Sequence, residues 1–238
     1  MKETFITELR AALQSKADPE TKESAGRFFK DGEKPLVYGV KSAGVRQIAK
    51  GFLKRAKGFM KSELYAVCEE LWRSQYLEEA VIACVFSESL KKQYEPSDFK
   101  VFERWVTTYV NNWADCDTLC NHTVGEFMMK YPEYVEALKG WATSPHRWTK
   151  RAAAVSLIIP ARKGLFLQDI FEIADILLHD KDDLVQKGYG WMLKAASESH
   201  PTEVYEYVLS KRATMPRTAL RYAIEKLPPE LKAEAMKR

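Results

Sequence analysis

The feature that most constrains this fold is a regular succession of helix signals with almost no signal for a β-strand. Apolar residues recur at helical spacing in segment after segment, and proline or a capping residue opens most of these segments. No sustained alternation of apolar and polar residues indicates a half-buried strand. We therefore expect helices over residues 4–17, 19–30, 62–72, 76–94, 96–110, 132–141, 145–159, 166–179, 182–199 and 201–211, and others that begin at residues 42, 112, 216 and 228.

Short turns join these helices, and the longest expected loop is Asp31–Lys41. Consecutive helices pair into units of roughly 35 to 45 residues, the size of a HEAT or armadillo repeat. The predicted fold is therefore all-α: one domain over residues 1–238, built as a HEAT-like or ARM-like helical-repeat solenoid (an alpha–alpha superhelix). The concave face of such a stack is its usual binding surface.

Composition excludes several classes of protein. The chain has no apolar run long enough to cross a membrane, and its charged, amphipathic N-terminus lacks the apolar core of a signal peptide. The four cysteines lie among helix-forming neighbours rather than at disulfide spacings, which predicts a reducing cytoplasm. With a formal net charge of +4, a nucleic-acid partner would need a local basic face.

Basic residues do form local clusters. They are Arg46, Lys50, Lys54, Arg55 and Lys57; then Arg147, Lys150 and Arg151; then Lys187 and Lys194; and Arg212, Arg217 and Arg221. One such cluster is typical of the solvated face of any helix. Clusters at equivalent places in successive helical units favour a surface that follows a phosphate backbone.

The six tryptophans divide into two groups. Trp72, Trp105 and Trp141 fall in apolar stripes and are predicted to be core. Trp113, Trp148 and Trp191 adjoin charged or small residues, which favours a groove lined by indole rings. The glycines at positions 188 and 190 precede Trp191 within a helix, where glycine is tolerated if a neighbouring backbone or ligand must approach closely.

Trp113 and Asp117 are four residues apart at the start of an expected helix, with Asn112 as its N-cap. Residues at this spacing project from one face, and an indole ring beside a carboxylate stabilises a cation. The alternative is a core tryptophan with an aspartate that answers the helix dipole.

Cys116 and Cys120 share a helix face near His122, but a fourth ligand at a standard spacing is missing. We therefore expect no metal, and no motif indicates a cofactor.

In its tryptophans, in Asp117 and in its basic clusters, the chain resembles the AlkD-like DNA alkylation repair glycosylases, a family with a HEAT-like fold. The resemblance covers essentially the whole chain and is carried by Trp113 with Asp117, by residues 148–154 and by residues 186–191. The helix 24–30, which contains Phe28, the loop to Gly39-Val40 and the pair Arg46-Gln47 also align by pattern.

The resemblance implies a catalytic cleft formed by Asp117, Trp113 and Trp191, with Arg151 holding the DNA backbone. The expected DNA contacts are Arg151, Trp148, Lys150, Arg147, Lys187, Lys194, Phe28 and Arg46. The chain departs from some relatives at Asn112, where a second aromatic can occur, at Phe28, where a tyrosine can occur, and at Ser42-Ala43, which replaces a Thr-Pro pair.

The implied activity is excision of N3- or N7-alkylated purines from double-stranded DNA without base flipping. Such a base is cationic and leaves readily, so the enzyme needs to stabilise the oxocarbenium-like deoxyribose and place a water. We expect a cytoplasmic monomer, associated with the nucleoid when bound to DNA, which binds the duplex on its concave face. Two alternatives stay open: a catalytically inactive paralogue that recognises distorted or branched DNA, and a protein–protein scaffold.

Overall fold

The all-α prediction is confirmed by the computed structural model, which describes residues 2–30 and 33–237. Within these ranges the one strand-like feature is an isolated parallel bridge between Leu36 and Tyr76. Asp31 and Gly32 of the expected loop lie outside the described residues.

The chain divides into two compact units, Met1–Leu119 and Cys120–Arg238. The single domain and its concave face are properties of the whole chain and stay predictions.

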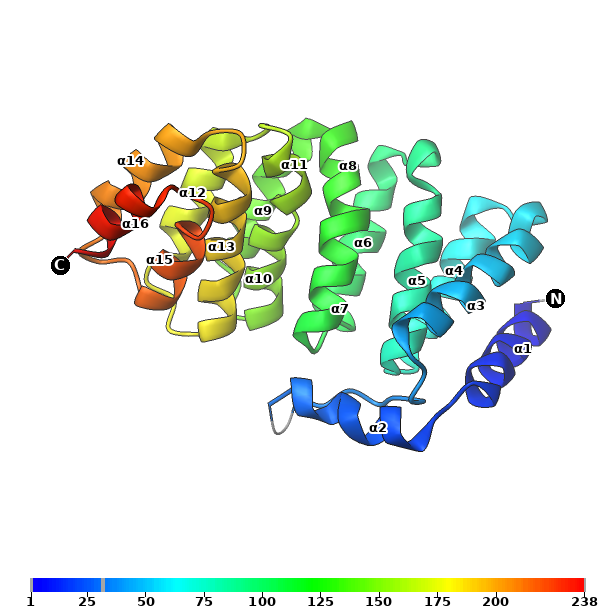
Figure 1. The fold of residues 1–238 in the computed structure, drawn as a ribbon. Coiled ribbons are helices and arrows are strands. Elements are labelled where there is room, and N and C mark those ends of the chain that lie inside the picture. Colours follow the sequence, from blue (N-terminus) through cyan, green and yellow to red (C-terminus); the bar gives the residue numbers. More distant parts are fainter. Residues whose placement is uncertain (1, 31–32, 238) are drawn as a thin grey trace. The chain divides into compact units, whose positions relative to one another are not determined.

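The α-helices of the first unit are α1 (Lys2–Ser15), α2 (Pro19–Ala25), α3 (Ser42–Arg55), α4 (Lys61–Arg73), α5 (Leu77–Ser89), α6 (Phe99–Thr108) and α7 (Trp113–Thr118). Short 3-10 turns add η1 (Gly26–Phe28), η2 (Ala56–Gly58), η3 (Lys91–Gln93) and η4 (Pro96–Asp98). Helix α5 packs on α3, α4 and α7, so it is the centre of this unit (Figure 1).

The core of the first unit is rich in aromatic rings. Trp72 and Trp105 are buried with their ring centroids 6.3 Å apart, as expected of core tryptophans. Phe5 of α1 packs edge-on against Phe52 of α3, with centroids 5.2 Å apart. These contacts join α4 to α6 and α1 to α3.

A buried carboxylate anchors the segment that leads into α3. Glu78 of α5 accepts hydrogen bonds from the backbone N–H groups of Tyr38 at 3.1 Å, Gly39 at 2.8 Å and Val40 at 3.0 Å. Gly39 has φ +95°, a left-handed conformation that favours glycine. This anchor fixes the path of the chain between η1 and α3.

A π-helical segment, η5 (Leu119–Val124), follows α7. The second unit then contains α8 (Gly125–Lys130), η6 (Pro132–Tyr134), α9 (Val135–Ala142), α10 (Arg147–Val155), α11 (Ile158–Arg162), α12 (Leu167–Leu177), α13 (Asp183–Ala196), α14 (Pro201–Lys211), α15 (Arg217–Ala223) and α16 (Pro229–Met236). Helix α13 packs against α10, α11, α12 and α15 and is the centre of this unit (Figure 1).

Close packing explains the two glycines of α13. A Cβ atom on Gly190 would lie 2.8 Å from the carbonyl oxygen of Ala219 and 2.7 Å from Cβ of Tyr222, both on α15. A Cβ on Gly188 would lie 3.3 Å from Cγ of Arg151 on α10. At Gly190 a neighbouring backbone approaches closely, as the sequence suggested, whereas at Gly188 the close neighbour is the Arg151 side chain.

Candidate functional site

Helix α7 begins as the sequence predicts, with Asn112 as its N-cap. The Asn112 side chain accepts a hydrogen bond from the backbone N–H of Asp115 at 3.0 Å, and Asn112 is fully buried. Trp113 is the first residue of the helix and Asp117 follows one turn later. Both side chains are half-buried, so each keeps a part of its surface exposed.

Trp113 is held by the segment that follows α2. Its ring stacks on Phe29, with centroids 5.5 Å apart and an interplanar angle of 25°. Its Nε1–H donates to the backbone carbonyl of Phe28 at 3.2 Å. Phe28 itself is 71% exposed, which places an apolar ring at the surface beside Trp113. Sequence reasoning missed Phe29, although its place next to Phe28 was a visible signal.

Two aspartates on α7 have different environments. Asp115 is buried, and burial raises its pKa from the ordinary 3.8 to about 7, against a smaller opposite effect of its hydrogen bond from Asn112. Asp117 is half-buried and lies two residues further along the helix, on a different face. Asp117 is therefore the carboxylate of this pair that can meet a ligand. Sequence reasoning missed Asp115.

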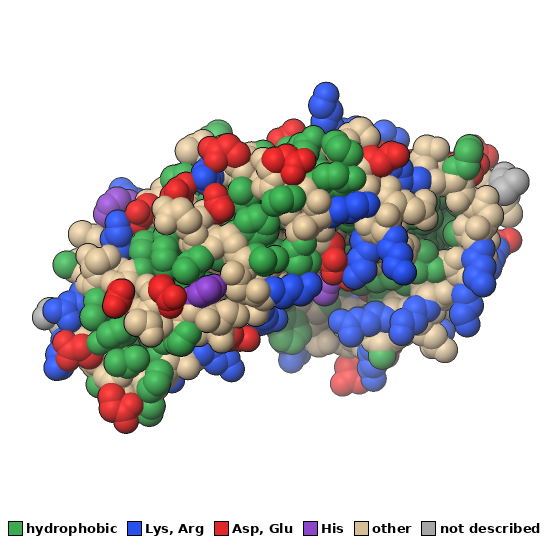
Figure 2. All heavy atoms as spheres, turned by 90° about the horizontal axis from the view of Figure 1, so that it is seen from above, with side chains coloured by type: hydrophobic (Ala, Val, Ile, Leu, Met, Phe, Trp, Pro, Cys, Tyr) green, Lys and Arg blue, Asp and Glu red, His purple; other side chains and the backbone are tan. Residues whose placement is uncertain are grey.

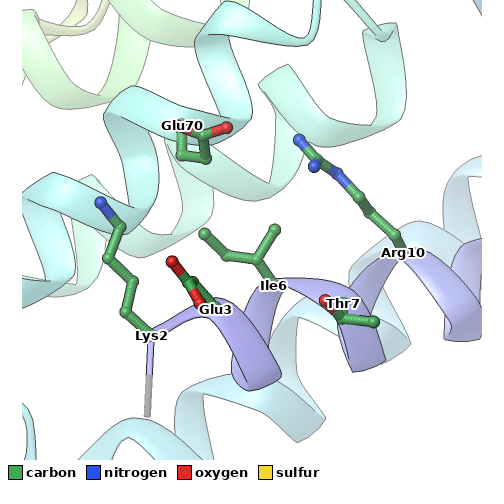
Figure 3. A pocket seen from close by; sticks show the side chains of 6 residues that line it. All are labelled: Lys2, Glu3, Ile6, Thr7, Arg10 and Glu70. Carbon is green, nitrogen blue, oxygen red and sulfur yellow. The ribbon is translucent and has the colours of Figure 1, made fainter.

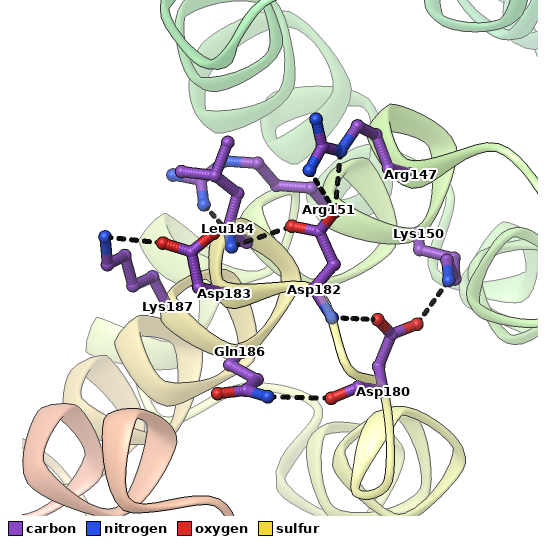
Figure 4. Close-up of polar contacts among 9 residues, drawn as sticks. All are labelled: Arg147, Lys150, Arg151, Asp180, Asp182, Asp183, Leu184, Gln186 and Lys187. Atoms are coloured by element: carbon purple, nitrogen blue, oxygen red, sulfur yellow. Dashed lines mark hydrogen bonds and ion pairs between the residues drawn. The ribbon is translucent and has the colours of Figure 1, made fainter. Parts of the chain in front are cut away.

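In the second unit, the basic residues of α10 meet acidic residues between α12 and α13 (Figure 4). The guanidinium of Arg147 donates through Nε to Asp182 at 2.7 Å, and Lys150 pairs with Asp180. Asp182 also caps α13 by accepting the backbone N–H of Leu184 at 2.9 Å. The positive charges of Arg147 and Lys150 are thus largely neutralised within the unit.

Arg151 is also on α10 but is 5% exposed. Its Nη1 donates to the backbone carbonyl of Leu184 at the start of α13 (Figure 4). The absence of a side chain at Gly188 makes room for it. The structure therefore places most of Arg151 inside the unit, with its charge next to the first turn of α13.

Trp148 does not line an open groove, and this expectation is wrong. Its side chain is only 4% exposed, because α10 presents it to the core of the unit. The guanidinium of Arg147 lies 5.4 Å from its ring centroid and covers it. Trp148 thus supports Arg147 rather than offering a surface for a base or sugar.

Trp191 differs from Trp148, because it is half-buried. Its indole N–H has no hydrogen-bond partner among the described residues, so it can donate to a ligand. The two lysines near it on α13 are paired: Lys187 with Asp183 at 3.1 Å and Lys194 with Glu225 at 2.6 Å.

Among the basic residues predicted to contact DNA, the one without a carboxylate partner within the described residues is Arg46 on α3. Arg46 is exposed, and within residues 2–30 and 33–237 no carboxylate lies at ion-pair distance from it. Figure 2 shows several Lys and Arg side chains gathered on the visible surface of the first unit. Arg147 and Lys150 on α10 each have a carboxylate partner, whereas Arg46 on α3 has none among the described residues. A phosphate therefore finds an available cation on α3 rather than on α10.

The first unit also has an open pocket of about 500 Å³ between α1 and α4 (Figure 3). Its lining includes Lys2, Glu3, Arg10 and Glu70, so both signs of charge face it. A pocket of mixed charge does not suit a polyanion. None of the predicted site residues lines it.

Within the described residues, no cluster of histidine, cysteine and carboxylate groups could hold a metal ion. All four cysteines are buried, and none of them is in a disulfide bond. No helix in these ranges is both long and apolar enough to cross a membrane.

Comparisons with known proteins identify a family and a fold for the chain. A family model described as "DNA alkylation repair enzyme" matches residues 9–227. Among solved structures, the chain is similar to "Predicted DNA alkylation repair enzyme from Enterococcus faecalis", with a TM-score of 0.79 and 16% identity over 90% of this chain and 98% of that chain. At this identity the likeness shows the fold alone, and it confirms the predicted helical-repeat fold. No curated protein matches the chain.

Proposed function

The chain belongs to the family of DNA alkylation repair enzymes, and from this premise we propose that it is a DNA glycosylase. Its substrate is duplex DNA that carries a cationic N3- or N7-alkylated purine. The observation that carries the proposal is the half-exposed pair of Trp113 and Asp117, one turn apart at a fixed helix start.

The chemistry follows from the charge of the substrate. An alkylated purine that is already cationic leaves as a neutral base, so no strong general acid is needed. Positive charge then develops on the deoxyribose, and the ionised carboxylate of Asp117 stabilises it and orients a water for attack. The indole faces of Trp113 and Trp191 stabilise the same charge. No step requires a metal, a cofactor or extrusion of the base.

The residues proposed to bind DNA differ in how freely their side chains can contact it. Arg46 and Phe28 are exposed, so a phosphate or a base step can meet them directly. Arg147, Lys150, Lys187 and Lys194 have carboxylate partners, so a phosphate must compete with those partners. Arg151 would act from beside the start of α13. We propose a monomer in the cytoplasm, associated with the nucleoid when bound to DNA.

Base release tests the proposal directly. The wild type should release N7-methylguanine or N3-methyladenine from a defined duplex in a single-turnover assay. Asp117→Asn keeps the size of the side chain but removes its charge, so it should lose at least about 100-fold in rate and keep its affinity for the duplex. Base release by Asp117→Asn at the wild-type rate would show that this carboxylate is not catalytic.

Salt dependence tests the role of Arg151. Arg151→Ala should weaken duplex binding and reduce the slope of log K against log salt by about one. Because Arg151 is buried, its replacement can also destabilise the fold, so the thermal stability of the Arg151→Ala variant is measured together with its duplex affinity. A salt slope equal to that of the wild type would exclude a phosphate contact. Tight binding of duplex by the wild type without base release would instead favour the inactive DNA-binding paralogue.

A further inference from the structure

The first turn of α7 rests on a buried pair of polar side chains. Asn112 is fully buried and Asp115 is 6% exposed. They are joined twice: the Asp115 backbone N–H donates to Asn112 Oδ1 at 3.0 Å, and Asn112 Nδ2 donates to Asp115 Oδ2 at 2.6 Å. The second bond is not needed to cap a helix, since the first one does that.

The Asp115 carboxyl is costly where it lies. Its Oδ1 is buried and has no hydrogen-bond partner among the described residues. A buried polar atom without a hydrogen-bond partner destabilises a fold. Where a protein keeps such an atom, the exception to the rule that buried polar groups are hydrogen-bonded points to a functional role. The cost could be avoided by a small apolar residue, so the Asn112–Asp115 pair needs an explanation other than stability.

Direct contact with the substrate is not that explanation. Residues two apart on a helix point to different faces, so the buried Asp115 cannot reach what Asp117 faces. Asp115 can act only through the helix it belongs to. The two hydrogen bonds hold the turn that begins with Trp113 and leads to Asp117, so they control the direction in which both side chains project.

We propose that the Asn112–Asp115 pair is a positioning device that aligns Asp117 and Trp113 for the reaction. This inference rests on the proposed glycosylase function. Trp113 is held from the other side by the stacked ring of Phe29 and the carbonyl of Phe28. The Asn112–Asp115 pair thus holds the backbone of Trp113, and Phe28 and Phe29 hold its indole ring.

The test separates positioning from binding and folding. Asp115→Ala should slow single-turnover base release at saturating enzyme by about 10-fold or more, with little change in duplex affinity, since small misplacements of catalytic groups are costly. Asp115→Asn keeps an oxygen that can accept from Asn112 Nδ2 and should restore most of the rate. Thr118→Ala is the matched control: it removes a 2.7 Å bond to the carbonyl of Ala114 on the same helix, and should leave the rate unchanged.

A second variant covers the case in which Asp115→Ala does not fold. Asn112→Ser keeps an oxygen that caps the helix but removes the amide group that donates to Asp115 Oδ2. It should slow base release as Asp115→Ala does. The indole N–H resonance of Trp113, assigned by its loss in Trp113→Phe, should shift in Asn112→Ser and stay in place in Thr118→Ala.

The outcomes distinguish this inference from the function on which it rests. If the wild type releases base and Asp117→Asn does not, the glycosylase function stands. Wild-type rates in both Asp115→Ala and Asn112→Ser, or an unmoved indole resonance, then overturn the positioning role alone. If the wild type releases no base, both proposals fail.

Discussion

Substitution of Gly190 by alanine tests how tightly α15 packs on α13. An alanine Cβ at this position would lie 2.7 Å from Cβ of Tyr222, 2.8 Å from the carbonyl oxygen of Ala219 and 3.1 Å from its Cα. Two of these three atoms belong to the backbone of α15, which cannot turn aside as the end of a flexible side chain can. To reach an ordinary contact of 3.4 Å, the helices must separate by roughly 0.7 Å.

The expected cost is the difference between two opposing effects. Overpacking a close helix contact typically costs about 1–3 kcal/mol, and a backbone contact lies at the upper end of this range. Replacing a mid-helix glycine by alanine stabilises a helix by about 1 kcal/mol. We therefore expect Gly190→Ala to lower the free energy of unfolding by about 2 kcal/mol, or the Tm by about 4–8 °C for a chain of this size.

Urea denaturation followed by circular dichroism measures this difference. The matched control is Gly140→Ala on α9, where an added Cβ would meet no atom within 4 Å. That variant should gain up to about 1 kcal/mol, because only the helix propensity changes. If Gly190→Ala were as stable as Gly140→Ala, the close approach of α15 to α13 at this point would be refuted.

Two further predictions concern buried carboxyl groups. The raised pKa of Asp115 means that the folded protein holds its proton more tightly than the unfolded chain does. Its contribution to stability is therefore present below about pH 4 and is lost as the pH rises to about 7, by up to about 4 kcal/mol. In denaturation curves measured from pH 4 to 8, the free energy of unfolding of Asp115→Asn should not show this loss. If the free energies of unfolding of Asp115→Asn and the wild type changed in parallel with pH, the prediction would be wrong. Glu78→Gln should lower the free energy of unfolding by about 1–3 kcal/mol, since its amide group would face the Tyr38 N–H, whose hydrogen bond Glu78 Oε2 now accepts; an unchanged urea midpoint would show that the charge of this anchor is dispensable.

Helix starts could be predicted because they depend on a few neighbouring residues. Asp18, Asn112 and Asp182 each accept a backbone N–H from a residue two or three positions later, so the capping signal is complete within a short window. The π-helical segment after α7 was not predicted. Its apolar spacing resembles that of an α-helix, and nothing in the residues themselves marks the wider turns.

Partners distant in the sequence could not be predicted. Arg147 and Lys150 were expected to meet phosphates, yet their carboxylate partners are Asp182 and Asp180, 35 and 30 residues further along the chain. Asp180, Asp182 and Asp183 stand close together in the sequence, but their place beside α10 follows from the packing of α10 on α13. Trp148 shows the same limit: its charged neighbours suggested exposure, while the turn of α10 directs it into the core.

The sequence by itself determined the helical fold and the positions of Trp113 and Asp117 one turn apart on α7, because helical periodicity and capping act over one or two turns. Only the tertiary structure decided which polar groups are buried. It placed Asp115 in the interior and left Asp117 half-exposed, although the two aspartates are two residues apart. Burial depends on which helix covers a face, and that is set by contacts between residues far apart in the chain.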